Sequence, residues 1–225
     1  RVATLKRALV LDEKTKKELG FDTKKTLDKI QKTVIEQQKE FERIFQIITK
    51  ELEEKGISLL NEKDLNSKQG AFVKEHFEDT VRQTLVPIML DKKIKFPELK
   101  DKVIYLFIKL GYTNQPEKYQ YSIIEVPTQV VSRFLVLPVT EKNKTQIILL
   151  DDVIRYCLPE IFSIFDYDKF EAYTIKLTRD AELDIDDDIS QSFVEKVSKS
   201  IKKRKIGLPV RFIYDATMPK DMLQN

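Results

Sequence analysis

Apolar residues in the first third of the chain recur at the spacing of one helix face. Between residues 22 and 55 they lie three, four or seven positions apart: Leu27, Ile30, Val34, Phe41, Ile44 and Ile48. This spacing predicts an amphipathic helix, which Asp22 or Thr23 can cap and Gly56 can end. At 1.5 Å per residue the helix would be about 50 Å long, which is too long for one small core.

A second helix is predicted to begin at Ser67, its N-cap, and to end before Pro87. Its apolar residues are Phe72, Val73, Phe77, Val81 and Leu85. We expect the two helices to pair as an antiparallel hairpin, although Gln37 and Glu51 interrupt the apolar stripe of the first. A dimeric coiled coil is the alternative.

The pattern changes period after Pro87, and residues 1–86 contain none of the eight prolines. Runs rich in β-branched and aromatic residues predict strands at 102–110, 119–126, 133–138, 145–150, 171–179 and 209–215. A short helix is predicted at 151–162 and a longer one at about 189–205. The predicted fold class is therefore α+β, in which a long helical hairpin (1–86) precedes a mixed β-sheet with helices packed on it (87–225).

Six carboxylates lie within nine positions, from Asp180 to Asp188. Asp184, Asp186, Asp188 and Glu195 have the spacing of an EF-hand calcium loop, but Ile189 stands where that loop needs glycine, and a strand pattern precedes it. The alternative interpretation places these acids along a strand and at the start of the helix at 189–205, where they complement its dipole. A partner-binding edge also stays open.

Basic residues gather at the other end of that predicted helix. Lys199, Lys202, Lys203, Arg204 and Lys205 form the densest cationic cluster of the chain. Neutralising phosphates releases counterions, so a contact with polyphosphate or nucleic acid is one hypothesis, and a solvated helix end is the other. No aromatic residues interleave with these lysines, which counts against nucleic acid.

Composition narrows the class of protein. With 41% apolar and 34% charged residues and a net charge of +3, the chain has the composition of a globular protein. Its one cysteine, Cys157, excludes an internal disulfide and favours a reducing compartment, so we expect a cytoplasmic protein. No apolar run approaches the length of a membrane span. A start without methionine predicts a piece of a longer polypeptide.

Catalytic motifs are missing from the sequence. His76 is the only histidine, and the five glycines are scattered singly, so there is neither a P-loop nor a dinucleotide fingerprint. No nucleophile has a visible base beside it. The residues alone therefore predict a non-catalytic module with no catalytic, cofactor or metal site of its own.

"TRDAELDID" (178–186) resembles a segment of the middle domain of the polyphosphate kinase family, and "RVATLK" (1–6) resembles the junction that leaves that family's N-terminal domain. Further similar segments are "FVKEHFEDTVRQTLVPIMLDKKIKFPEL", "IIEVPTQVVSRFLVLP", "QIILLDDVIRYCLPEIF" and "GLPVRFIYDATMP". The resemblance spans essentially the whole chain and identifies it as a middle (head) domain with the end of an N-terminal domain.

The resemblance implies a division of labour. The parent enzyme would transfer the terminal phosphate of ATP to polyphosphate, with Mg²⁺, through a phosphohistidine in C-terminal domains. His76 does not match that catalytic motif. The middle domain would shape the enzyme and pair it as a homodimer, with its own catalytic domains as partners and polyphosphate as a possible one. The rival hypotheses are a free-standing helical interaction module and a weak polyanion or nucleic-acid binder.

Overall fold

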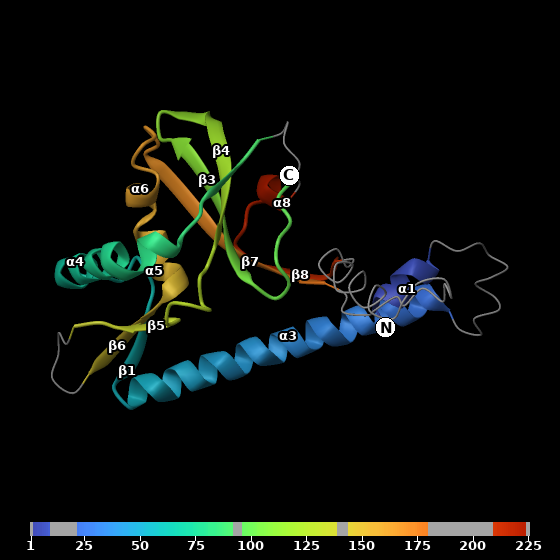
Figure 1. Cartoon of the computed structure of the whole chain (residues 1–225). Coiled ribbons are helices and arrows are strands. Elements are labelled where there is room, and N and C mark those ends of the chain that lie inside the picture. Colours follow the sequence, from blue (N-terminus) through green and yellow to red (C-terminus); the bar gives the residue numbers. More distant parts are fainter. Residues whose placement is uncertain (1, 10–21, 92–95, 139–143, 180–208, 224–225) are drawn as a thin grey trace, which may run out of the picture. The chain divides into compact units, whose positions relative to one another are not determined.

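The computed structural model describes residues 2–9, 22–91, 96–138, 144–179 and 209–223 (Figure 1). The acidic segment from Asp180 to Asp188 and the predicted helix at 189–205 lie outside the described residues. Two compact units can be distinguished, and each is described by itself. Unit 1 draws on Arg1–Gln46, Leu99–Lys102 and Leu177–Phe212, and unit 2 on Ile47–Glu98, Val103–Lys176 and Ile213–Asn225.

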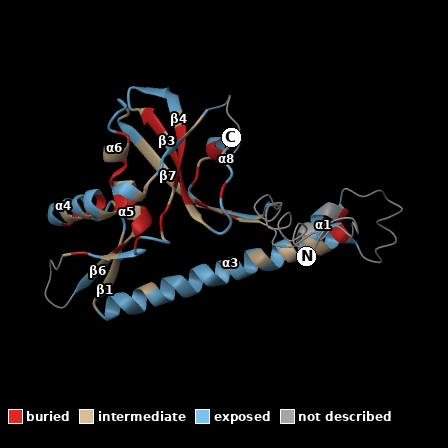
Figure 2. Cartoon of the chain, viewed as in Figure 1, coloured by how far each residue is buried: buried red, intermediate tan, exposed pale blue. Residues whose placement is uncertain are grey.

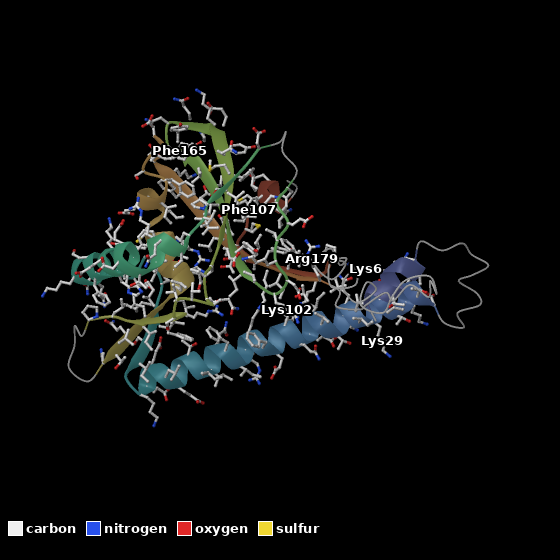
Figure 3. The ribbon with its side chains drawn as sticks, viewed as in Figure 1. Lys6, Lys29, Lys102, Phe107, Phe165 and Arg179 are labelled. Carbon is white, nitrogen blue, oxygen red and sulfur yellow. The ribbon has the colours of Figure 1, made fainter. Side chains whose placement is uncertain are left out.

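Unit 1 contains α1 (Val2–Ala8) and most of α3 (Thr23–Glu54). Asp22 caps α3, because its Oδ1 accepts a hydrogen bond of 2.9 Å from the backbone N–H of Lys25. Gly56, which adopts a φ of 80°, follows the helix and lets the chain turn away. The helix predicted for residues 22–55 is confirmed. Within the same unit, the backbone N–H of Arg179 donates to Asp101 Oδ1 at 2.7 Å, beside Lys102 (Figure 3).

Unit 2 holds most of a five-stranded sheet with the order β2-β4-β3-β7-β8. Its strands are β2 (Ile88–Leu90), β3 (Ile104–Tyr112), β4 (Gln115–Glu125), β7 (Lys169–Arg179) and β8 (Pro209–Tyr214). β3 pairs antiparallel with both β4 and β7. Leu106, Ile108 and Leu110 on β3 are completely buried, as the sequence of a central strand predicts.

A second, three-stranded sheet in unit 2 has the order β1-β6-β5. Its strands are β1 (Ile57–Leu60), β6 (Thr145–Leu149) and β5 (Phe134–Val136). β1 and β6 run parallel, whereas β5 and β6 run antiparallel, so this sheet is mixed. The α+β class is confirmed, and so are the six predicted strands, but they divide between two sheets. β1 and β2 were not predicted, because runs of three or four residues are too short to show a period.

The second helical segment of the chain is α4 (Ser67–His76), followed by a π-helical turn (Phe77–Val81) and a 3₁₀ turn (Arg82–Thr84). Its N-cap is Asn66 rather than Ser67. Asn66 Oδ1 accepts from the backbone N–H of Gln69 at 3.0 Å, and the Gln69 side chain accepts in return from Asn66 N–H at 3.1 Å. This reciprocal pair is a capping box.

The antiparallel pairing predicted for the two helices stays a prediction, because most of α3 belongs to unit 1 and the second helical segment to unit 2. Val73, Phe77 and Val81 are completely buried, and they pack into the core of unit 2 with β3, β6 and α5 (Leu150–Tyr156). The apolar residues of α3 from Ile35 to Leu52 are exposed, whereas Leu27, Ile30 and Val34 are half-buried. Figure 2 shows α3 exposed along most of its length. Two sheets offer a wider apolar surface than one narrow helix stripe, so the second helical segment is buried against them.

Two short helices complete unit 2. The helix predicted for residues 151–162 is present as α5 and α6 (Leu158–Ile161), and α8 (Lys220–Leu223) lies near the end of the described chain. α8 is attached to the five-stranded sheet by an ion pair of 2.8 Å between Lys109 Nζ and Asp221 Oδ2. Met218, just before α8, and Met222, within it, are buried at 6% and 3% exposure.

Gly70 allows α4 to approach α5 closely. A Cβ added at Gly70 would lie 2.1 Å from the Tyr156 hydroxyl oxygen and 2.9 Å from the ring carbon that bears it. We expect Gly70→Ala to lower the free energy of unfolding by about 1–3 kcal/mol, because Tyr156 must leave its position. Urea unfolding followed by circular dichroism measures this.

A second variant separates this clash from a general effect on the helix. Tyr156→Phe removes the nearest atom, so in that background Gly70→Ala should cost less than in the wild type. An equal cost in both backgrounds would contradict the close approach. Ala71→Gly, at an exposed neighbouring position of α4, reports the ordinary propensity difference.

Candidate functional site

A buried cluster of charged side chains in unit 2 centres on Arg155 of α5. Its Nε donates to the carbonyl oxygen of Ala172 at 3.3 Å and its Nη2 to Thr174 Oγ1 at 2.5 Å, both on β7. Its Nη1 lies 2.5 Å from Asp152 Oδ1 and 3.5 Å from Asp151 Oδ2. One guanidinium therefore joins α5 to β7 and faces two carboxylates.

All three charged side chains are largely withdrawn from water. The exposed fraction is 14% for Arg155, 13% for Asp152 and 10% for Asp151. Burial raises the pKa of Asp152 to about 6, and the charges of Asp151 and Glu62 act in the same direction, whereas Arg155 opposes the rise. Among the described residues, Asp151 Oδ1 is buried without a hydrogen-bond partner.

This cluster opens on one side into a hollow of about 990 Å³. The turn after β1, the helices α5 and α6, the start of β7 and the segment after β8 all contribute to its wall. Five carboxylates line it, from Glu62, Asp152, Asp168, Glu171 and Asp215, against three cations, from Lys63, Arg155 and Lys169. Lys169 Nζ lies 2.9 Å from a carboxylate oxygen of Glu171. Because the carboxylates outnumber the cations, the charge of the hollow suits neither ATP nor polyphosphate.

No group of three or more His, Cys, Asp or Glu among the described residues could hold a metal ion. His76 is the last residue of α4 and is half-buried. Cys157 is completely buried, and burial raises the pKa of its thiol to about 12, which leaves it unreactive.

The predicted polyanion contact falls outside the described part of the structure. Lys199, Lys202, Lys203, Arg204 and Lys205 all lie between residues 180 and 208, as do the aspartates of the calcium hypothesis. Both hypotheses stay predictions. One feature of the sequence points to the Arg155 cluster: Asp151 and Asp152 stand four and three residues before Arg155, a spacing that places them beside it on a helix.

One face of α3 forms a second candidate surface. Five large apolar residues lie along it and are at least 40% exposed: Phe41 (66%), Ile44 (44%), Phe45 (50%), Ile48 (49%) and Leu52 (40%). Their spacing of three and four residues keeps them on one side of the helix. The described parts of the chain leave this stripe, named here the α3 apolar face, open to solvent. Contiguous exposed apolar surface is typical of interaction sites.

No helix in the described residues is both long and apolar enough to cross a membrane.

Comparison with known proteins defines the class of domain. Residues 68–225 match the family model described as "Polyphosphate kinase middle domain", and residues 1–60 match "Polyphosphate kinase N-terminal domain". The fold agrees, since a crystal structure of polyphosphate kinase from Porphyromonas gingivalis superimposes with a TM-score of 0.70 at 26% identity. That match covers 98% of this chain and 30% of the other.

Curated relatives give the same result. Polyphosphate kinase of Vibrio vulnificus (strain YJ016) is 33% identical over 228 residues, which cover 100% of this chain and 32% of that protein. Polyphosphate kinase of Escherichia coli (strain K12) is 33% identical over 229 residues, with the same coverage. The chain belongs to the polyphosphate kinase family, and it spans about a third of the length of these relatives.

Proposed function

We propose that this chain is the structural and dimerisation part of a cytoplasmic polyphosphate kinase. The parent enzyme would transfer the terminal phosphate of ATP, with Mg²⁺, to polyphosphate through a phosphohistidine in its C-terminal domains. Family membership supports the activity of the parent. The exposed apolar residues along α3 support the structural role.

The α3 apolar face is the observation that carries the dimerisation role. An isolated amphipathic helix of 32 residues gains little from leaving large apolar side chains in water. A C2 dimer presents the same patch twice, so two antiparallel copies of α3 could cover each other. Ionic residues beside the stripe, such as the Glu40–Arg43 pair at 2.7 Å, would form a polar rim around that contact.

Charges placed on this face should break the dimer. Burying an isoleucine contributes roughly 1.5 kcal/mol or more, so Ile44→Glu/Ile48→Glu should weaken self-association of the full-length enzyme at least about 100-fold. Light scattering coupled to size exclusion, over a range of protein concentrations, measures this. The wild type should be a dimer under conditions in which the variant is a monomer.

A matched control changes the net charge equally on the opposite face of the helix. Gln46→Glu/Lys50→Gln adds the same two units of negative charge as Ile44→Glu/Ile48→Glu, and it should leave the dimer intact. A wild type that stays monomeric at every concentration would refute the dimerisation role. Equal weakening by both double variants would instead show that net charge, rather than the α3 apolar face, controls association.

A further inference from the structure

The Arg155 cluster lies at the junction of the two sheets of unit 2. α5 begins at Leu150, directly after the last residue of β6 in the three-stranded sheet. From the last turn of α5, Arg155 donates to Ala172 and Thr174 on β7 in the five-stranded sheet. The guanidinium therefore joins an extension of one sheet to a strand of the other, within the same compact unit.

The charges at this junction do not balance. One guanidinium faces Asp151 and Asp152, and each of the two carboxylates is nine-tenths buried or close to it. Asp152 receives the shorter contact with Arg155, at 2.5 Å, whereas Asp151 keeps one buried oxygen without a partner among the described residues. Two buried like charges that share one counter-ion favour the uptake of a proton by one of them.

Asp152 is the carboxylate that a proton can reach. It lines the hollow, whereas Asp151 does not contribute to the wall. We propose that Asp151, Asp152 and Arg155 form a proton-responsive junction, in which Asp152 binds a proton under mildly acidic conditions and leaves Arg155 balanced by Asp151 alone. Proton uptake removes the excess negative charge where α5 meets β7 and so stabilises the contact between the two sheets.

Other titratable groups line the same hollow as Asp152 on each surrounding element. They are Tyr156 on α5, Glu62 and Lys63 after β1, Asp168, Lys169, Glu171 and Tyr173 at β7, and Asp215 after β8. Lys169 and Glu171 pair with each other, and Tyr173 donates to Glu171 at 3.3 Å. Asp215 accepts from the backbone and hydroxyl of Thr217. Glu62 adds a further negative charge, which favours the protonated form.

The direction of the pH dependence follows from the raised pKa of Asp152. A carboxyl whose pKa is about 6 in the folded chain, against 3.8 as the ordinary value, binds its proton more tightly when folded. The contribution of Asp152 to the free energy of unfolding is complete below pH 3.8 and is lost as the pH rises through about 6. This is opposite to a carboxylate held by a salt bridge, such as Glu171, whose pKa the neighbouring Lys169 lowers.

The test compares thermal unfolding of the wild type with that of Asp152→Asn, which is neutral at every pH. On going from pH 7.5 to pH 5, the Tm of the wild type should rise relative to that of the variant by about 4 °C. The comparison depends on the change with pH, so a constant offset between the two proteins does not matter. A difference that is independent of pH would overturn the proposal.

Two further measurements keep the outcome clear. Glu171→Gln removes a carboxylate from the same hollow and should give a difference from wild type that stays flat or changes in the opposite direction. If Asp152→Asn does not fold, NMR titration of ¹³C-labelled aspartate carboxyls in the wild-type chain gives the answer without a variant. An aspartate that titrates near 6 is expected, and the absence of any aspartate midpoint above about 5 would overturn the proposal.

Discussion

Phe77→Ala should lower the free energy of unfolding of unit 2 by about 3–5 kcal/mol, the range found for phenylalanine truncations in protein cores. Phe77 is completely buried and packs in one cluster with residues of β3, β6 and α5. Removing its ring leaves a cavity between helix and sheet that neighbouring side chains fill only in part. The chain has no tryptophan, so urea unfolding is followed by far-UV circular dichroism.

Two control variants distinguish core burial from other effects. Phe134→Ala changes the same residue type in the same unit at a position with 60% exposure, and it should cost less than about 0.5 kcal/mol. Ile48→Ala, at 49% exposure on α3, should cost less than about 1 kcal/mol at low protein concentration. A cost of about 2–5 kcal/mol for Ile48→Ala would show that Ile48 is buried in the folded chain and would contradict its exposure.

The helices themselves were predictable, but their packing was not. Six apolar residues at regular spacing define α3, and the predicted bounds of 22–55 differ little from the observed Thr23–Glu54. An amphipathic stripe indicates that a helix buries one face, but it does not say against which element. The sheets have more apolar surface to offer than α3, so Val73, Phe77 and Val81 pack against them. The stripe on α3 is left exposed.

Short strands and long-range polar contacts could not be predicted from the sequence either. β1 has four residues and β2 has three, too few to show an alternation, yet β1 pairs with β6 and β2 pairs with β4. The capping box of Asn66 and Gln69 was readable in principle, because the two residues stand at the right spacing. The contact of Arg155 with β7 spans 17 and 19 positions, and no local pattern contains it.

The family resemblance predicted the identity of the domain, which the residue patterns did not. Six ordered segments predicted a polyphosphate kinase middle domain with the end of an N-terminal domain, and the family matches confirm this. Composition and spacing alone would have stopped at a non-catalytic α+β module. The residues predicted to contact polyphosphate stay untested, since they lie outside the described residues.

Arg155→Met should lower the free energy of unfolding of unit 2 by about 3 kcal/mol at pH 7.5. Methionine fills much of the volume but leaves Asp151 and Asp152 buried without a counter-ion, and it removes the hydrogen bonds to Ala172 and Thr174. The cost should shrink as the pH falls toward 5, because Asp152 then binds a proton. Urea unfolding at several pH values, followed by circular dichroism, measures both effects.

Arg82→Met is the matched control in the same unit. Arg82 forms an ion pair of 2.6 Å with Glu78, but their side chains are 48% and 45% exposed, so its loss should cost less than about 1 kcal/mol. Adding Asp152→Asn to Arg155→Met should raise the free energy of unfolding at pH 7.5, because it removes one of the two buried carboxylates that lack a counter-ion. Equal costs for the two arginine variants, or no recovery in the double variant, would show that the buried junction does not hold α5 to β7.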